Sequence, residues 1–193
     1  MNLFLEGERI GLRTIKKSDL EYLEVLFSDR ETAALIGEIY PMTEKNLQDF
    51  YDKCQDEKDR IWFVIVDKKS GKIIGETGFL RIFMPWRRAD FSLIIWDKDF
   101  HGEGYGEETA RLMLDYGFNT LNLHRLAVGV VGINRAALKF WKKIGFVEEG
   151  REIEGFFLEG AYSDFVMLSL LESNYREIKF KCNSRQFKKH RSS

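Results

Sequence analysis

The residues with the clearest chemical potential are three alternating glycines in the segment His101-Gly102-Glu103-Gly104-Tyr105-Gly106. The segment lies between a predicted strand and a predicted helix. Glycines at alternate positions let the backbone approach a ligand closely and let successive N–H groups point the same way. The helix dipole adds positive potential at the helix N-terminus. The pattern therefore indicates an anion site suited to a pyrophosphate, with a tight turn that binds no ligand as the alternative.

Two common nucleotide-binding patterns fit this loop poorly. A Walker loop needs a Lys followed by Ser or Thr directly after its last glycine, and Gly106 is followed by Glu107-Glu108. A Rossmann turn reads G-x-G-x-x-G and has an acid at the end of the next strand. Here the next predicted strand ends in Gly129-Val130-Val131-Gly132. Both patterns are disfavoured.

Two carboxylates on predicted strands are candidates for a general base. Asp90 is the first, because strand alternation places Asp90 and Ser92 on one face, from which a carboxylate could reach a bound ligand directly or through water. A salt bridge from Asp90 to Arg87 or Arg88 is the structural alternative. Glu76, on the preceding predicted strand, is the second candidate.

The elements that must position these residues alternate between strand and helix. Strands are predicted over 9–13, 60–67, 72–83, 88–96, 125–131, 146–153 and 162–170. Helices are predicted from a capping box at Ser18–Glu21 to about residue 27, and over 43–57, 104–121 and 134–144. This order predicts an α/β fold with a mixed sheet and helices on both faces.

The composition limits the class of protein. The chain has 193 residues with 44% hydrophobic and 32% charged residues, which fits one domain with a sizeable core. It holds no apolar run long enough to span a membrane. An acid occurs as early as Glu6, which is not typical of a secretory signal. The two cysteines match no metal-binding or disulfide pattern. We expect a cytoplasmic protein without a metal site.

The charge is distributed unevenly along the chain. Residues 176–193 carry a net charge of +6, and residues 1–175 carry −7. We therefore predict a domain over 1–175 and a basic C-terminal tail over 176–193. The tail is either a solvated extension, a contact to RNA or the ribosome, or an arm that stabilises a homodimer.

Two motifs together resemble a known family. The glycine loop is similar to the Q/R-x-x-G-x-G/A loop of the GCN5-related N-acetyltransferases (GNAT), with His101 at the Gln/Arg position. Thirty residues later, the segment Asn134–Phe146 is similar to that family's N-x-x-A-x-x-x-Y-x-x-x-G-F motif. The resemblance covers about residues 5–175. Within the family, the chain resembles enzymes that acetylate the N-termini of ribosomal proteins and enzymes that acetylate spermidine.

The resemblance implies the acyl-CoA N-acyltransferase fold, with a mixed sheet of about seven strands that splays between strands 88–96 and 125–131. It implies acetyl-CoA as the donor, with pantetheine along strand 88–96 and pyrophosphate on the glycine loop. The cofactor-binding residues that it implies are Leu93, Ile94, Ile95, Trp96, His101, Gly102, Gly104, Tyr105, Gly106, Glu107, Asn134, Ala137, Phe140, Trp141 and Lys143. Lys143 would meet the 3′-phosphate or remain a solvated helix lysine.

The expected reaction is direct attack of a primary amine on the thioester. An amine with a pKa of about 10 is neutral in only about one molecule per thousand at pH 7, so the reaction gains from a general base. A backbone N–H near Leu93–Ile95 could stabilise the oxyanion. Many relatives protonate the departing thiolate with a Tyr where this chain has Trp141. An indole N–H only donates a hydrogen bond, so Trp141 either packs against the cofactor or marks lost activity.

The acceptor is less well defined. A cluster of residues near the first two predicted helices would suit a cationic amine, although acids are also common at exposed helix ends: Asp29, Glu31, Glu38, Tyr40 and Glu44. Arg81 and Trp86 suit a peptide or a substrate carboxylate better than a polyamine. We therefore rank a protein N-terminus or a small amine above a polyamine. The alternatives of another class are a catalytically weak CoA-binding sensor and a ribosome- or RNA-associated protein.

Overall fold

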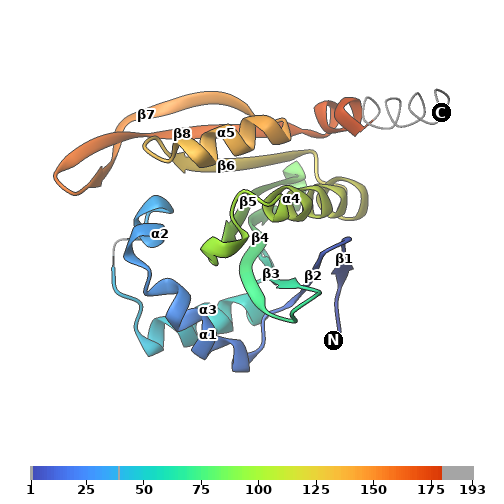
Figure 1. Ribbon diagram of the computed structural model, residues 1–193. Helices are drawn as coiled ribbons and strands as arrows, with labels where there is room; N and C mark the ends of the chain where they lie inside the picture. Colours follow the sequence, from blue (N-terminus) through green and yellow to red (C-terminus); the bar gives the residue numbers. More distant parts are fainter. Residues whose placement is uncertain (1, 39, 180–193) are drawn as a thin grey trace.

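The computed structural model describes residues 2–38 and 40–179, and these form one mixed sheet with helices on both faces (Figure 1). In the described chain the sheet has eight strands in the order β1-β2-β3-β4-β5-β6-β8-β7. The strands are β1 Leu5–Glu6, β2 Ile10–Thr14, β3 Ile61–Asp67, β4 Ile73–Phe83, β5 Arg88–Ile95, β6 Arg125–Val131, β7 Val147–Leu158 and β8 Ala161–Leu171. The helices are α1 Leu20–Phe27, α2 Arg30–Leu35, α3 Glu44–Asp56, α4 Tyr105–Asp115 and α5 Arg135–Ile144, together with a helical segment over 172–179.

The predicted α/β class and element order are confirmed, with three local corrections. The short strand β1, which pairs with β2, and the six-residue helix α2 were not predicted. Ser18 does not cap the first helix. Instead, the Asp19 carboxylate accepts from the Lys16 N–H at 2.7 Å and forms a two-bonded ion pair with Arg13. The ion pair of the buried Asp19 with the half-buried Arg13 therefore fixes how the chain enters α1.

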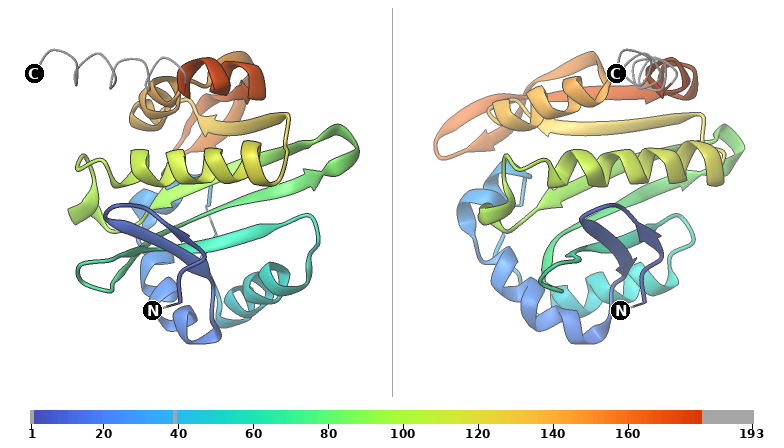
Figure 2. Two further views of the ribbon diagram at one scale, coloured as in Figure 1. Left: turned by 90° about the vertical axis from the view of Figure 1, so that its right-hand side faces the viewer. Right: turned by 45° about the vertical axis from the view of Figure 1, so that its right-hand side comes forward.

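Strand β3 explains why both faces of the sheet are covered. Phe63 and Ile65 point into a core shared with α4 and α5, whereas Val64 and Val66 point into a second core beneath α1 and α3. Successive strand residues alternate between faces, so a strand that is apolar throughout needs cover on both sides. Figures 1 and 2 show α4 and α5 on one face of the sheet and α1 and α3 on the other.

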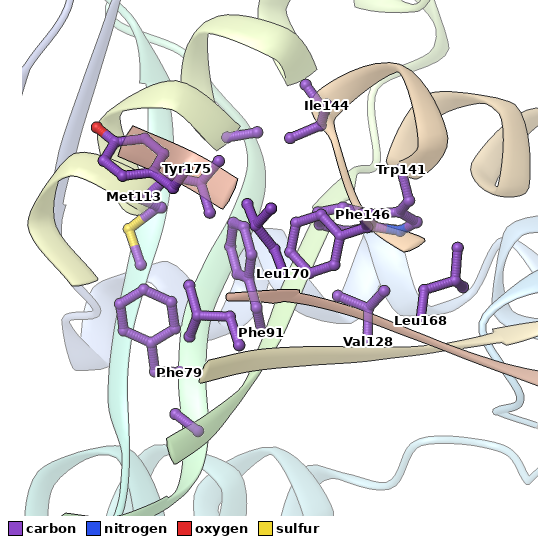
Figure 3. Close-up of a cluster of buried hydrophobic side chains, with 14 of the residues drawn as sticks. Phe79, Phe91, Met113, Val128, Trp141, Ile144, Phe146, Leu168, Leu170 and Tyr175 are labelled. Carbon is purple, nitrogen blue, oxygen red and sulfur yellow. The ribbon is translucent and has the colours of Figure 1, made fainter. Parts of the chain in front are cut away.

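An aromatic cluster fixes α5 on the larger core. The ring centroid of Trp141 lies 5.1 Å from that of Phe91 on β5 and 5.0 Å from that of Phe146 (Figure 3). Helix α5 begins at the N-cap Asn134 and ends at Gly145, whose φ of 116° is left-handed, as the sequence predicts. The helix is therefore held rigidly beside β5.

The helical segment 172–179 packs on the same core and spans the predicted boundary between residues 175 and 176. Tyr175 stacks on Phe118 at a centroid distance of 4.9 Å and donates a hydrogen bond to Asp115 at 2.9 Å. Residues 180–193, which make up most of the predicted basic tail, lie outside the described residues. Among the helices that the structure describes, none is long and apolar enough to cross a membrane.

The feature that creates the site is the divergence of two parallel strands. β5 and β6 are paired only at Arg88–Arg125, Ala89–Leu126 and Asp90–Ala127. Beyond Asp90 the strands separate, as Figure 1 shows. The predicted splay is confirmed, and it leaves one backbone edge of β5 unpaired with β6 from Phe91 to Ile95.

Candidate active site

A cavity of about 970 Å³ lies where β5 and β6 separate. One part is lined by β5, β6, the glycine loop and α5. The other part is lined by α1, α2, β3 and β4, with Phe27, Glu31, Leu35, Glu38, Met42, Phe50, Arg60, Trp62, Glu76 and Leu80 among its residues. The two parts meet at β5, so a ligand held by the unpaired strand edge would face the second part.

The hydrogen-bond phase of β5 shows which backbone groups reach the open edge. The Trp96 N–H donates to the Ile74 carbonyl of β4 at 3.0 Å. Bonding in an antiparallel pair alternates along each strand, so Ile94 also points its backbone groups at β4, whereas Leu93 and Ile95 point theirs at the gap. Of the four strand residues expected to bind the cofactor, Leu93 and Ile95 can therefore offer backbone groups, and Ile94 and Trp96 cannot.

The glycine loop has the geometry of an anion site. Gly102 and Gly104 both have left-handed φ angles, 77° and 86°. Gly104 is the N-cap of α4, and no side chain caps that helix. The N–H groups of Tyr105, Gly106 and Glu107 lie in the first turn of α4, where a helix has no carbonyl of its own to accept from them. The loop thus presents unused donors and the positive end of a helix dipole to the cavity.

Three side chains near the loop are already engaged. His101 Nε2 lies 2.7 Å from the Ile95 carbonyl oxygen, so His101 closes the end of the open strand edge. Glu107 forms ion pairs with Lys143 at 2.5 Å and with Arg111 at 2.7 Å, and the Lys143 bond lowers the Glu107 pKa below its ordinary value. The Tyr105 ring meets the ring of Phe100 edge-on at a centroid distance of 4.9 Å, and Tyr105 is not among the described residues that line the cavity.

The start of α5 forms the opposite wall. The Asn134 side chain accepts from the Ala137 N–H at 3.0 Å and donates to the Leu35 carbonyl of α2 at 3.2 Å. Asn134 therefore joins α5 to α2 across the cavity. Ala137 and Phe140 also line this wall. These three residues lie where the sequence predicts cofactor contacts.

Glu76 is the ionisable group buried deepest in the cavity wall. It is 3% exposed, and the Trp62 indole N–H donates to its carboxylate at 3.2 Å. Burial raises its pKa to about 7, against the lowering effect of Trp62. The Trp96 indole N–H also lowers this pKa, but it does not reach hydrogen-bond geometry. A carboxyl with a pKa near neutrality suits a general base.

Comparison with known proteins assigns the sequence to a family. The family model described as "Acetyltransferase (GNAT) domain" matches residues 9–147. The chain belongs to the GNAT family. A spermidine N(1)-acetyltransferase from Escherichia coli (strain K12) is 30% identical over 86% of this chain and 88% of its own length. A Bacillus subtilis protein provisionally named a ribosomal N-acetyltransferase is 32% identical over 54% of this chain and 57% of its own length.

Solved structures agree. The crystal structure of spermidine N-acetyltransferase from Vibrio cholerae in complex with CoA and spermine matches with a TM-score of 0.81 and 29% identity, over 88% of this chain and 99% of that one. The same Vibrio enzyme has also been solved as a dodecamer. The GNAT chain described here is accordingly an acetyl-CoA-dependent N-acetyltransferase, as the two motifs predict.

Within the GNAT site, the two predicted base candidates have different surroundings. Asp90 forms an ion pair with Arg81 at 2.5 Å, not with Arg87 or Arg88, and it is not among the described residues that line the cavity. β4 bulges after Leu80, where Arg81 takes a left-handed φ of 51°. This bulge places the guanidinium beside Asp90. Glu76 faces the cavity and forms no ion pair with any residue that the structure describes.

Trp141 of the GNAT motif is 6% exposed and packs against Phe91, Phe140 and Phe146. It also lines the cavity. Its surroundings are those of a core aromatic residue, and the structure offers it no ionisable partner within the described residues. Packing beside the cofactor is therefore the interpretation that the geometry supports.

Sequence reasoning missed Trp62, which holds the carboxyl of Glu76. Its strand is apolar at nearly every position, so alternation gives no sign of which residues face a ligand. Arg60, beside it in the cavity wall, was also missed, and it pairs with Glu57 at 3.0 Å. Only the pairing of β3 with β4 brings these residues to Glu76.

Proposed function

We propose that this GNAT enzyme acetylates a small amine that carries a second positive charge, of the polyamine type. The observation that carries the proposal is the charge of the acceptor part of the cavity. Its cations are already neutralised: Lys98 pairs with Asp29 at 3.1 Å and with Glu31 at 3.0 Å, and Arg60 pairs with Glu57. This proposal ranks a polyamine above the N-terminal amine that the sequence favours.

Two acids of the acceptor part lack such a cation. Among the described residues, no ion pair involves Glu38 or Glu76; the charge of Glu38 raises the pKa of Glu76, and the charge of Arg60 lowers it to a smaller extent. Glu76 would face the amine that reacts, and Glu38, an exposed residue nearer the surface, would face a second ammonium group. Opposite charges within a few ångströms favour the cationic form of the ligand. The names of the spermidine-acetylating relatives support the same assignment.

In the proposed reaction Glu76 removes a proton from the ammonium group of the acceptor. The neutral nitrogen attacks the thioester carbonyl of acetyl-CoA, a C–N bond forms and the C–S bond breaks. The N–H of Leu93 or Ile95 stabilises the oxyanion. CoA leaves as a thiolate, and the second proton of the attacking nitrogen passes to it through water, because Trp141 has none to give at neutral pH. Glu76 then releases its own proton to solvent. The products are an N-acetyl amine and CoA.

The test is CoA thiol release with a panel of acceptors. The panel holds a triamine, a diamine, a monoamine of matched length and short peptides with free N-termini. The Glu38→Gln variant should raise KM for the triamine and diamine about three- to five-fold and leave the monoamine unchanged, since one exposed charge pair contributes up to about 1 kcal/mol. Glu24→Gln, on an exposed part of α1 outside the cavity lining, is the control.

Other outcomes separate the remaining interpretations. Peptides as the best acceptors would favour N-terminal acetylation, and acetyl-CoA binding without turnover on any acceptor would favour a sensor. A ribosome or RNA contact through the basic tail remains a prediction, because most of the tail lies outside the described residues. A homodimer also remains a prediction. A cytoplasmic location, expected from the sequence, would suit an enzyme that consumes acetyl-CoA.

A further inference from the structure

The glycine loop is held in place by contacts with a segment near the N-terminus, the turn that ends at Arg9. Two left-handed glycines within three residues make the loop expensive to order, because glycine loses more backbone freedom than other residues. The turn between β1 and β2, which ends at Arg9, lies against the glycine loop and the first turn of α4. Arg9 is not among the residues that line the cavity.

Arg9 contacts the loop in three ways. Its Nη1 donates to the Glu103 carbonyl at 2.8 Å, in the middle of the glycine segment. Its Nε donates to the Glu108 carboxylate at 3.0 Å, on the first turn of α4. Its guanidinium stacks on the Tyr105 ring, 4.5 Å from the ring centroid. One side chain therefore holds residues before, at and after the N-terminus of α4.

Glu108 completes the anchor. Its Oε1 accepts from the backbone N–H of Arg9 at 2.8 Å and from that of Ile10 at 3.3 Å. A Cβ on Gly7 would lie 2.4 Å from the same oxygen, so a larger residue at this position would displace the Glu108 carboxylate. The Glu108 side chain is 17% exposed and that of Arg9 is 41% exposed, and hydrogen bonds between charged groups are stronger than those between neutral ones.

We propose that Arg9 is a positioning residue for acetyl-CoA, holding the glycine loop in the conformation that binds the pyrophosphate. It acts through the loop and does not touch the reacting atoms. The inference rests on acetyl-CoA as donor and does not depend on which amine is the acceptor.

The test compares acetyl-CoA with acetyl-pantetheine, a thioester that lacks the adenosine 3′-phosphate together with the pyrophosphate. Arg9→Ala should raise the Kd for CoA, measured by calorimetry, about ten-fold, as expected when charged hydrogen bonds are lost. It should lower kcat/KM for acetyl-CoA by a similar factor and leave kcat/KM for acetyl-pantetheine, which lacks the pyrophosphate, within two-fold. Arg9→Lys should recover only part of the affinity, because an ammonium cannot bridge two acceptors and stack in one geometry.

Lys68→Ala is the matched control. Lys68 Nζ contacts the same turn, at Glu6 (3.3 Å) and at the Gly7 carbonyl (3.0 Å), but makes no contact with the glycine loop. It should leave the Kd for CoA unchanged. An equal loss for both thioesters in Arg9→Ala would show a general packing role and overturn the proposal, as would an unchanged Kd. Should Arg9→Ala fail to fold, Arg9→Lys carries the same comparison.

Discussion

The Trp62 indole N–H donates a hydrogen bond to the carboxylate of Glu76 on the neighbouring strand, and Glu76 is only 3% exposed to solvent. The bond favours the carboxylate, whereas burial favours the neutral acid, and burial prevails to give a pKa of about 7. We expect the protonation of Glu76 to affect both the proposed proton transfer and the pH dependence of stability.

The first prediction concerns stability. Between pH 4.5 and about 7 the folded protein holds a proton on Glu76 that the unfolded chain has released. The free energy of unfolding should therefore fall as pH rises through this window, by roughly 3 kcal/mol for this group. Urea unfolding at pH 5 and pH 8 measures the change. In Glu76→Gln this contribution should vanish, and an unchanged slope would show that Glu76 does not titrate in that range.

The second prediction isolates the hydrogen bond. Trp62→Phe removes the N–H donor and keeps an aromatic ring beside Phe50, whose centroid lies 5.9 Å away. Loss of a donor to the carboxylate should raise the Glu76 pKa, and the acidic limb of the kcat–pH profile should move up by about one unit. Phe50→Leu disturbs the same ring contact without touching the carboxyl and should not move the limb. A shift in Phe50→Leu instead would point to packing.

The third prediction concerns Trp141. Because the indole is buried among Phe91 and Phe146, Trp141→Phe should keep kcat within about three-fold, whereas Trp141→Ala should cost about 3–5 kcal/mol of stability. Steady-state kinetics and thermal unfolding measure both. A loss of a hundred-fold in Trp141→Phe would give the indole a chemical role. A large gain in Trp141→Tyr would show that a missing acid limits the rate.

The fourth prediction concerns the 3′-phosphate of CoA. Lys143 is exposed and pairs with Glu107 at the cavity. If it also binds this phosphate, Lys143→Ala should weaken CoA several-fold and leave dephospho-CoA unchanged in calorimetry. Lys142→Ala is the control, because Lys142 pairs with Glu148 and does not line the cavity. Equal weakening of both ligands would assign Lys143 to the loop only.

Local features of the site could be predicted from the sequence. The glycine loop and the helix predicted over 134–144 depend on residues a few positions apart, so their spacing predicts their structure. The splay of β5 from β6 followed only from the family resemblance, because strand pairing is not a local property. Arg9 could not be found, since its partners lie 94 to 99 residues away.

The choice of base shows a different limit. Alternation can assign Asp90 to a face, but it cannot show that a bulge at Arg81 supplies that carboxyl with a cation. Nor does it show that Glu76 is enclosed by Trp62 from the next strand. Helix α2 was missed because six residues are too few for a periodic signal.

In the proposed reaction Glu76 takes the proton from the acceptor amine. The most direct measurement is kcat between pH 5.5 and 9 for the wild type, Glu76→Gln and Asp90→Asn, with saturating acetyl-CoA and the best acceptor. We expect the wild-type rate to rise through about pH 7, Glu76→Gln to lose at least about a hundred-fold together with that limb, and Asp90→Asn to retain both. Full activity in Glu76→Gln, or collapse in Asp90→Asn, would contradict the claim.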